Sequence, residues 1–217
     1  MKIVGLGAGG HAKVIIDILS HYSEYQIVGL TSPEPERIGQ HVLGIPILGN
    51  DDLLPQLRVE GVTGVFIGVG SISNCELRRK LFNLAVELDF DVIHAKHPTA
   101  VIAQSVEMGA GVAIMAQVAI NPATRIEHNV IVNTGAQVDH DCCIGQHTHI
   151  APGAHIAGGV KIGPCSHVGI GATIIQEINI GQNVIVGAGA VVLKDIPSGA
   201  TAIGSPARII RQTKIDP

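Results

Sequence analysis

The sequence predicts a Rossmann-like α/β domain followed by an all-β parallel coil of six-residue repeats. Two observations lead to this prediction. Strand and helix patterns alternate over roughly the first 95 residues. After that, every sixth residue from Ile102 to Val192 is aliphatic, a period that fits short strands joined by turns and does not fit a helix. The predicted domains are therefore 1–96 for the α/β domain, 97–196 for the coil, and 197–217 for an exit loop and tail.

The α/β domain is expected to form a small parallel sheet with helices on its faces. Ser73 and Glu76 form a capping box before one of these helices, because each side chain can bond a free backbone N–H of the other. The expected strands are 2–6, 26–30, 45–48 and 62–69, and the expected helices are 12–21, 51–57 and one that follows the capping box.

The coil is expected to be a triangular prism with an aliphatic interior. Three six-residue edges make one turn of 18 residues, and successive turns stack at the strand spacing of about 4.8 Å. This period predicts a scaffold and carries no chemistry by itself. Turn residues from Pro197 onward end the repeat, and the last few residues are expected to form a short helix.

Composition excludes several kinds of partner and site. The formal net charge is -4 and no block of Lys or Arg is present, which argues against nucleic acid as the partner. Apolar runs are too short for a membrane span, and the N-terminus lacks the pattern of a signal peptide. The four cysteines Cys75, Cys142, Cys143 and Cys165 show no C-x-x-C spacing, so reduced thiols in a cytoplasmic protein are expected.

Three features together resemble one family: the Gly7–His11 loop, the repeat, and the exit Gly204–Arg208. The chain is similar over nearly its whole length to hexapeptide-repeat nucleotide-sugar acetyltransferases, a group related to sialic acid O-acetyltransferases and to the bacillosamine-pathway UDP-4-amino-sugar N-acetyltransferase. The resemblance implies a left-handed β-helix, a homotrimer, and acetyl-CoA bound between neighbouring subunits.

His140 is the candidate catalytic base. It follows the inward-facing Val138 by two residues, so its ring should point outward near a corner of the coil. An imidazole suits proton removal near neutral pH, and the carboxylate of Asp141 could fix its tautomer and raise its basicity. The resemblance assigns a catalytic histidine followed by an acidic residue to these positions. The alternative for His140 is an ordinary solvated histidine of a loop.

The resemblance also assigns acetyl-CoA contacts to His149, Ile170 and Ala188. The glycines on either side of Ile170 and Ala188 would let the pantetheine arm approach the backbone, although the repeat alone already requires glycine in its turns. His147, His149 and His167 raise the possibility of a metal site. No acidic or cysteine ligand completes such a set, and transfer from a thioester requires no metal, so none is expected.

The loop after the first strand is a candidate phosphate-binding site, because Gly5, Gly7 and Gly10 match the dinucleotide fingerprint. The second strand ends without an acidic residue that could hold an NAD ribose. The resemblance assigns the loop to a nucleotide-sugar acceptor, and Thr31 and Ser32 stand where many relatives have an acidic pair. The residues assigned to the acceptor are Gly7, Ala8, Gly9, Gly10, His11, Thr31, Ser32 and Gly70.

The function expected on this basis is transfer of acetyl from acetyl-CoA to the amino group of a nucleotide-linked amino sugar. The sugar is expected to be a UDP-linked 4-amino-4,6-dideoxy-N-acetyl sugar used in surface glycan or polysaccharide synthesis. One alternative is O-acetylation of a sialic-acid-type sugar. An alternative of another class is a β-helix protein that is either non-catalytic or metal-dependent. Three histidines at coil spacing would indicate the metal-dependent one.

Overall fold

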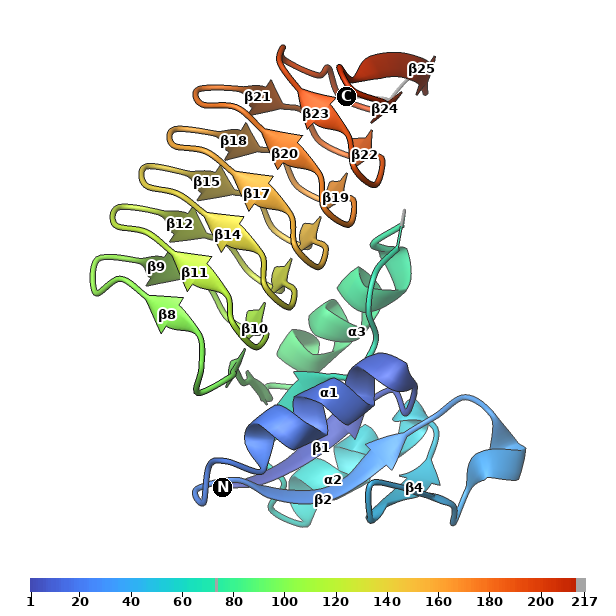
Figure 1. Ribbon diagram of the computed structural model, residues 1–217. Helices are drawn as coiled ribbons and strands as arrows, with labels where there is room; N and C mark the ends of the chain where they lie inside the picture. The colour runs from blue at the N-terminus through green and yellow to red at the C-terminus, as the bar shows by residue number, and fades with distance from the viewer. Residues whose placement is uncertain (73, 214–217) are drawn as a thin grey trace. The chain divides into compact units, whose positions relative to one another are not determined.

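A computed structural model describes residues 1–72 and 74–213. The chain divides into two compact units, each with its own core (Figure 1). The first unit contains Met1–Gly70 and Glu76–Lys96, and the second contains Ser71–Cys75 and the chain from His97 onward. None of the helices in the described part of the chain is long and apolar enough to cross a membrane.

The first unit is a six-stranded sheet, in the order β3-β4-β2-β1-β5-β6, with three α-helices. All its strand pairs are parallel except β3 with β4. The strands of this sheet are β1 (Lys2–Leu6), β2 (Gln26–Thr31), β3 (His41–Val42), β4 (Ile45–Gly49), β5 (Gly64–Ile67) and β6 (Asp91–Val92). The short strand β7 (Ala95–Lys96), at the end of the first unit, is not part of it. The helices of the first unit are α1 (Gly10–Leu19), α2 (Leu54–Val59), α3 (Glu76–Glu87) and the short 3-10 turns η1 (Pro35–Arg37) and η2 (Asp51–Leu53). The predicted Rossmann-like arrangement is confirmed.

Packing sets the details of this sheet. Ile3, Val4 and Leu6 are fully buried on β1, and a Cβ on Gly5 would lie 2.3 Å from the Phe66 ring. Gly5 therefore serves strand packing rather than phosphate binding. Helix α3 begins at Glu76, two residues later than a cap at Ser73 would place its start, and Ser73 itself lies outside the described residues.

The second unit is a left-handed parallel β-helix with three faces. Its strands are mostly two residues long, and each pairs with the strand one 18-residue coil later, as Ile114 does with Val132. The first face contains β10 (Ala113–Ile114), β13 (Ile131–Val132), β16 (His149–Ile150), β19 (His167–Val168), β22 (Ile185–Val186), β24 (Ala200–Ile203) and β25 (Arg208–Gln212). The second contains β8 (Val101–Ile102), β11 (Ala119–Ile120), β14 (Gln137–Val138), β17 (His155–Ile156), β20 (Thr173–Ile174) and β23 (Val191–Val192). The third contains β9 (Glu107–Met108), β12 (Arg125–Ile126), β15 (Cys143–Ile144), β18 (Lys161–Ile162) and β21 (Asn179–Ile180).

The repeated aliphatic positions fill the prism, which is the scaffold that the period predicts. They are buried from Ile114 to Val192, whereas Ile102 and Met108, in the first coil, are half-buried. Buried hydroxyls bond the corners: Thr148 donates to the Gly163 carbonyl at 3.1 Å and Ser166 to the Gly181 carbonyl at 2.8 Å. A buried polar group that is bonded in this way avoids the desolvation cost of an unmade bond.

Two expectations about the second unit are wrong. In the tail up to residue 213 the chain forms a strand in place of the expected helix, since β25 turns back antiparallel to β24; the part of that expectation that falls on residues 214–217 lies outside the described residues. Cys75 and Cys165 are not reduced thiols, since they form a disulfide across 90 residues with a Cα–Cα distance of 5.5 Å. Local spacing rules could not detect this pair, because Cys75 reaches the coil only through the segment Ser71–Cys75.

Candidate active site

His140 and Asp141 form a hydrogen-bonded pair at a corner of the β-helix. His140 Nδ1 lies 2.7 Å from Asp141 Oδ2, and both side chains are well exposed. Asp141 has a φ of 58° and its N–H donates to the Pro122 carbonyl, so the turn itself holds the carboxylate against the ring. With Nδ1–H donating to Asp141, Nε2 keeps a lone pair and can accept a proton.

Asp139 extends this pair into a small network. Its Oδ1 accepts the Asn121 amide at 2.7 Å and the His140 backbone N–H at 2.8 Å, and these bonds lower the pKa of the Asp139 carboxyl. The hydrogen bond to Asp141, and secondly the charge of Asp139, raise the pKa of His140 above its ordinary value. A raised pKa makes the ring a stronger proton acceptor once it is neutral.

Gly158 makes room for the His140 ring. It occupies the corner one coil after His140, and a Cβ there would lie 2.6 Å from Cε1 and 2.7 Å from Nε2 of the imidazole. Any larger residue would have to displace the ring from its bond to Asp141. Gly158 thus positions the base without providing a functional group of its own.

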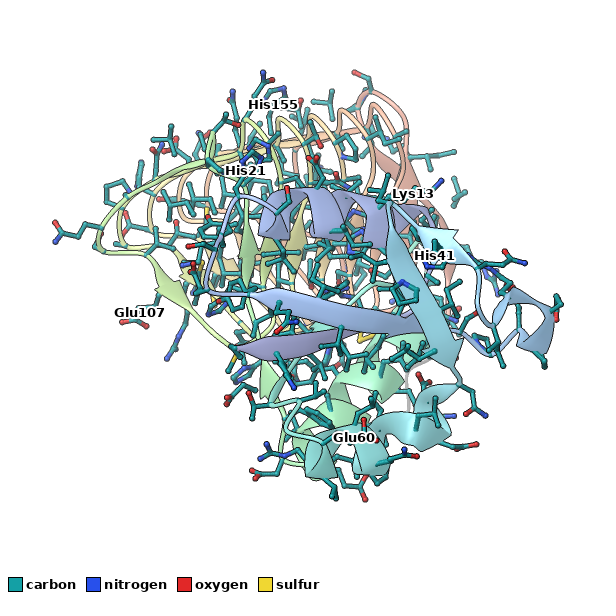
Figure 2. All side chains as sticks on the ribbon, turned by 90° about the horizontal axis from the view of Figure 1, so that it is seen from below. Lys13, His21, His41, Glu60, Glu107 and His155 are labelled. Carbon is teal, nitrogen blue, oxygen red and sulfur yellow. A yellow bond between two sulfur atoms is a disulfide. The ribbon has the colours of Figure 1, made fainter. Side chains whose placement is uncertain are left out.

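A shallow groove of about 400 Å³ follows the second face of the coil beside this corner. Gln137, Asp139, His155 and Thr173 contribute polar groups to its lining. His155 projects outward from the coil (Figure 2), and its Nδ1 lies 3.2 Å from Gln137 Oε1. The groove is partly apolar and partly polar, and it lies next to the candidate base.

Ile170 and Ala188 occupy the opposite edge of the same face, in the turns that precede β20 and β23. Both are exposed, and they stack one coil apart, with the Gly189 N–H donating to the Ile170 carbonyl at 2.8 Å. Among the described residues, neither the Ile170 nor the Ala188 N–H donates a hydrogen bond. These outward N–H groups could bind an amide carbonyl of a pantetheine arm.

His149 lies elsewhere, on β16 of the first face, and is only 7 % exposed. Its Nδ1 lies 2.5 Å from the Ser71 carbonyl and its Nε2 lies 3.1 Å from the Asn133 amide. These partners select the Nδ1–H tautomer, with Nε2 accepting. The His167 ring stacks edge-on at 5.0 Å, and burial lowers its pKa. Within one subunit, His149 and the groove are therefore on different faces, and the predicted cofactor contact of His149 stays a prediction.

The Gly7–His11 loop connects β1 to α1 in the first unit. Gly7 has a φ of 102°, a conformation that favours glycine, and its N–H donates to the Thr31 carbonyl at 3.2 Å. Gly9 and Gly10 are exposed, and no side chain caps the start of α1. The N–H groups of this first turn are therefore available to a phosphate.

Buried Arg78 supports the far side of the loop. Its guanidinium donates to the carbonyls of Ile67 and Val69 at 3.1 and 2.8 Å and lies 3.5 Å from His11 Nε2. Burial lowers the pKa of Arg78 to about 9, so the group remains charged at neutral pH. It holds the strand end next to Gly70, whose nearest side chain is that of His11.

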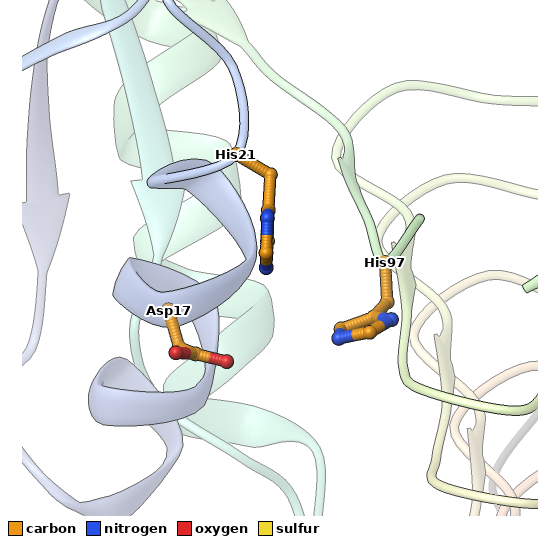
Figure 3. Close-up of side chains that lie close together, drawn as sticks. All are labelled: Asp17, His21 and His97. Carbon is orange, nitrogen blue, oxygen red and sulfur yellow. The ribbon is translucent and has the colours of Figure 1, made fainter. Parts of the chain in front are cut away.

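Among the described residues, neither unit by itself contains three residues placed to hold a metal ion. Figure 3 shows Asp17 and His21, one helical turn apart at the end of α1, together with His97 of the second unit. No single unit supplies three ligands from this group, which is the only such group among the described residues. The expectation of a metal-free site stays a prediction.

Comparison with known proteins places the chain in a family. Residues 2–85 match the PglD N-terminal domain. The chain is 30% identical over 165 residues to GDP-perosamine N-acetyltransferase of Escherichia coli O157:H7, which covers 73% of this chain and 71% of that protein. The chain belongs to the nucleotide-sugar acetyltransferase family.

Two solved structures support this assignment over nearly the full length. A perosamine N-acetyltransferase from Caulobacter crescentus, solved with CoA and GDP-perosamine, is 41% identical with a TM-score of 0.91, and the match covers 98% of each chain. The acetyltransferase domain of PglB from Neisseria gonorrhoeae, solved with acetyl coenzyme A, is 34% identical with a TM-score of 0.88 and covers 96% of this chain and 98% of that one. The predicted enzyme class, an acetyl-CoA-dependent sugar N-acetyltransferase, and the predicted co-substrate are confirmed.

Several residues near the candidate site were not predicted. Asn121 is one coil before Asp139 and Gly158 is one coil after His140, so the 18-residue register could have identified both. Arg37 and Asp51, which approach the loop and the end of β2 in the first unit, lie in no repeat. No local pattern in the sequence points to them.

Proposed function

We propose that this protein transfers acetyl from acetyl-CoA to the amino group of a sugar carried by a nucleoside diphosphate. The observation that carries the proposal is the His140–Asp141 pair beside the groove on the second face. The perosamine enzymes named above act on GDP-perosamine by name, which favours GDP over the UDP expected from sequence. The product would serve surface glycan or polysaccharide synthesis.

The proposed chemistry needs one proton acceptor and one good leaving group. The sugar amine loses its proton to His140 Nε2 as its nitrogen forms a bond to the thioester carbonyl carbon. The carbon–sulfur bond then breaks, and the sulfur of CoA leaves with the electron pair and receives a proton. Asp141 stabilises the imidazolium that forms in between, through Nδ1.

His140, Asp141, Ile170 and Ala188 are proposed to act together on one face. His140 and Asp141 would provide the base, and the outward N–H groups of Ile170 and Ala188 would bind the pantetheine arm. His149 lies on a different face of the coil from the groove. It is therefore proposed to contact an acetyl-CoA molecule that is bound in the groove of a neighbouring subunit. The residues proposed to hold the nucleotide sugar are Gly7, Ala8, Gly9, Gly10, His11, Thr31, Ser32 and Gly70.

A homotrimer is part of the proposal, because the edges of a triangular prism suit threefold packing. Ile170 is 61% exposed and Leu193 is 47% exposed in the single chain, and both would be covered in such an assembly. Sedimentation combined with activity at decreasing protein concentration tests this. Activity should fall as the trimer dissociates, and a fully active monomer would contradict the shared site.

The deciding experiment is a competition between acceptors. Purified protein receives acetyl-CoA with equal amounts of a GDP-linked 4-amino sugar and a sialic-acid-type sugar, and the products are separated by mass. Exclusive or dominant acetylation of the amine is expected. Faster acetylation of the sialic-type hydroxyl would favour the O-acetyltransferase alternative, and no transfer to either would reject the proposed acceptor class.

A further inference from the structure

Asp51 lies against the end of β2, although it follows a different strand, β4. Thr31, at the end of β2, is completely buried and donates from Oγ1 to Asp51 Oδ1 at 2.5 Å. Asp51 follows β4 and is half-buried. Its Oδ2 accepts no hydrogen bond from any described residue, so this oxygen and one lone pair of Oδ1 remain available.

The strand order determines which part of a nucleotide could reach Asp51. The phosphate-binding loop follows β1, β2 is the next strand, and β4 is the one beyond it. Backbone bonds join these ends: the Gly7 N–H donates to Thr31 and the Ser32 N–H donates to Gly49 at 2.7 Å. Asp51 is therefore about two strand spacings, or roughly 10 Å, from the loop. The nucleobase is the part of a nucleoside diphosphate that is farthest from its phosphates.

Arg37 lies at the phosphate-binding loop, on the other side of β2 from Asp51. Its Nη2 donates to the Ala8 carbonyl at 2.9 Å and its Nη1 bonds Glu34 at 3.2 Å. These contacts use two of the five N–H donors of a guanidinium. A cation held directly on the loop, with donors to spare, can bind a diphosphate that lies against the exposed N–H groups of Gly9 and Gly10.

We infer that the nucleotide is a guanosine diphosphate, with Asp51 selecting the guanine and Arg37 binding the diphosphate. This inference rests on the proposed function only for the claim that a nucleotide occupies this unit. Guanine presents two adjacent donors, N1–H and the N2 amino group, which match a carboxylate. Uracil presents one N–H between two carbonyl oxygens, and these oxygens repel a carboxylate. Thr31 orients the Asp51 carboxylate through its hydrogen bond.

The test is calorimetric binding of GDP and of UDP to the full chain, without acetyl-CoA or sugar. The wild type should bind GDP about tenfold to a hundredfold more tightly than UDP, the discrimination expected of a bidentate pair. Asp51→Asn keeps an oxygen for Thr31 but presents an amide N–H to guanine, so the preference should fall to within about threefold. Asp52→Asn removes the same charge at the exposed neighbouring residue, which bonds only Asn50 among the described residues, and should leave the preference unchanged.

Arg37→Ala provides the second measurement. It should weaken GDP and UDP by the same factor, about tenfold, because both share the diphosphate. Arg58→Ala, whose side chain pairs with Asp89, is the matched control and should bind both nucleotides as the wild type does. An Arg37→Ala variant that loses affinity for only one nucleotide would overturn the assignment of Arg37.

The base assignment fails if the wild type binds UDP as tightly as GDP, or if Asp51→Asn weakens both nucleotides equally. Binding requires no acetyl transfer, so these outcomes can be separated from failure of the proposed function. A protein that prefers GDP but acetylates no amino sugar would retain this inference and lose the proposal. A protein that acetylates UDP-sugars and prefers UDP would retain the proposed acetyl transfer to a nucleotide-linked amino sugar and overturn the assignment of guanine to Asp51.

Discussion

The two units of this protein differ in how their structures arise from sequence and in the work proposed for each. In the coil, the parallel strand pairings recur at 18 residues, and Asp141, beside His140, has the same positive φ as Ala123 and Glu177 at neighbouring corners. In the first unit, contacts such as Thr31 with Asp51 join positions that no period relates. In the proposed function, the coil provides the chemistry and the α/β unit provides recognition. Coil-corner variants should therefore change turnover, and first-unit variants should change affinity for the acceptor.

The largest effect should come from removing the base. His140→Ala should lower kcat by about 10²–10⁴-fold, the usual cost of losing a general base, with little change in the KM of the acceptor. Steady-state kinetics at saturating acetyl-CoA measure both values. His128→Gln changes another exposed corner histidine, one that accepts a bond from the Ala110 N–H, and should leave kcat unchanged. A His140→Ala variant within a few-fold of wild type would exclude His140 from the mechanism.

Gly158→Ala should give the next largest loss, about tenfold in kcat. The added Cβ would lie 2.6 Å from the His140 ring, so the ring must shift from its bond to Asp141, and small displacements of a catalytic group are costly. The double variant with His140→Ala is the control, because Gly158→Ala should have no further effect once the ring is gone. Additive losses in the double variant would show that Gly158 acts on something other than the base.

Thr31→Val should change affinity and leave turnover unchanged. Loss of one hydroxyl leaves Asp51 without its orienting bond, and a single hydrogen bond of this kind contributes about 1 kcal/mol, or roughly fivefold in KM. The half-exposed Asp51 carboxylate can be solvated instead, so the unit should remain folded. Thr31→Ser, which keeps the hydroxyl, should restore the KM. A loss in kcat rather than in KM would contradict the division of work between the two units.

The sequence predicts those parts of each unit that depend on local patterns, and it does not predict contacts between distant segments. A repeat samples one local geometry many times, so the aliphatic period from Ile102 to Val192 was sufficient to predict faces, corners and an outward His140. The Gly7–His11 loop was predictable because a phosphate cradle is a local motif. The Asp51–Thr31 bond and the Cys75–Cys165 disulfide depend on how distant segments meet, and the β25 strand depends on its pairing with β24. Such long-range pairings leave no local pattern.

The smallest effect should be a shift in the pH dependence of the rate when Asp141 is changed, and this effect is specific to the His140–Asp141 pair. The hydrogen bond that His140 Nδ1–H donates to Asp141 is the main cause that raises the pKa of His140, and the charge of Asp139 adds to it. Activity requires the neutral ring, so the rate falls as pH drops through this pKa. Asp141→Asn removes the charge, lowers the His140 pKa, and should move the acid limb of the kcat/KM profile to lower pH. Near the optimum the loss should be less than about tenfold, since the base itself remains.

The acceptor amine also titrates, so the comparison between variants is what isolates His140. Protonation of the sugar amine contributes the same limb in every variant, and any difference between the profiles belongs to the enzyme. Asp139→Asn should move the acid limb in the same direction by a smaller amount, because its charge is the second cause of the raised pKa. Asp52→Asn, a charge change in the other unit, should not move it. An Asp141→Asn profile that coincides with that of the wild type would mean that the rate does not depend on the His140 proton, and the assignment of turnover to this corner of the coil would fail.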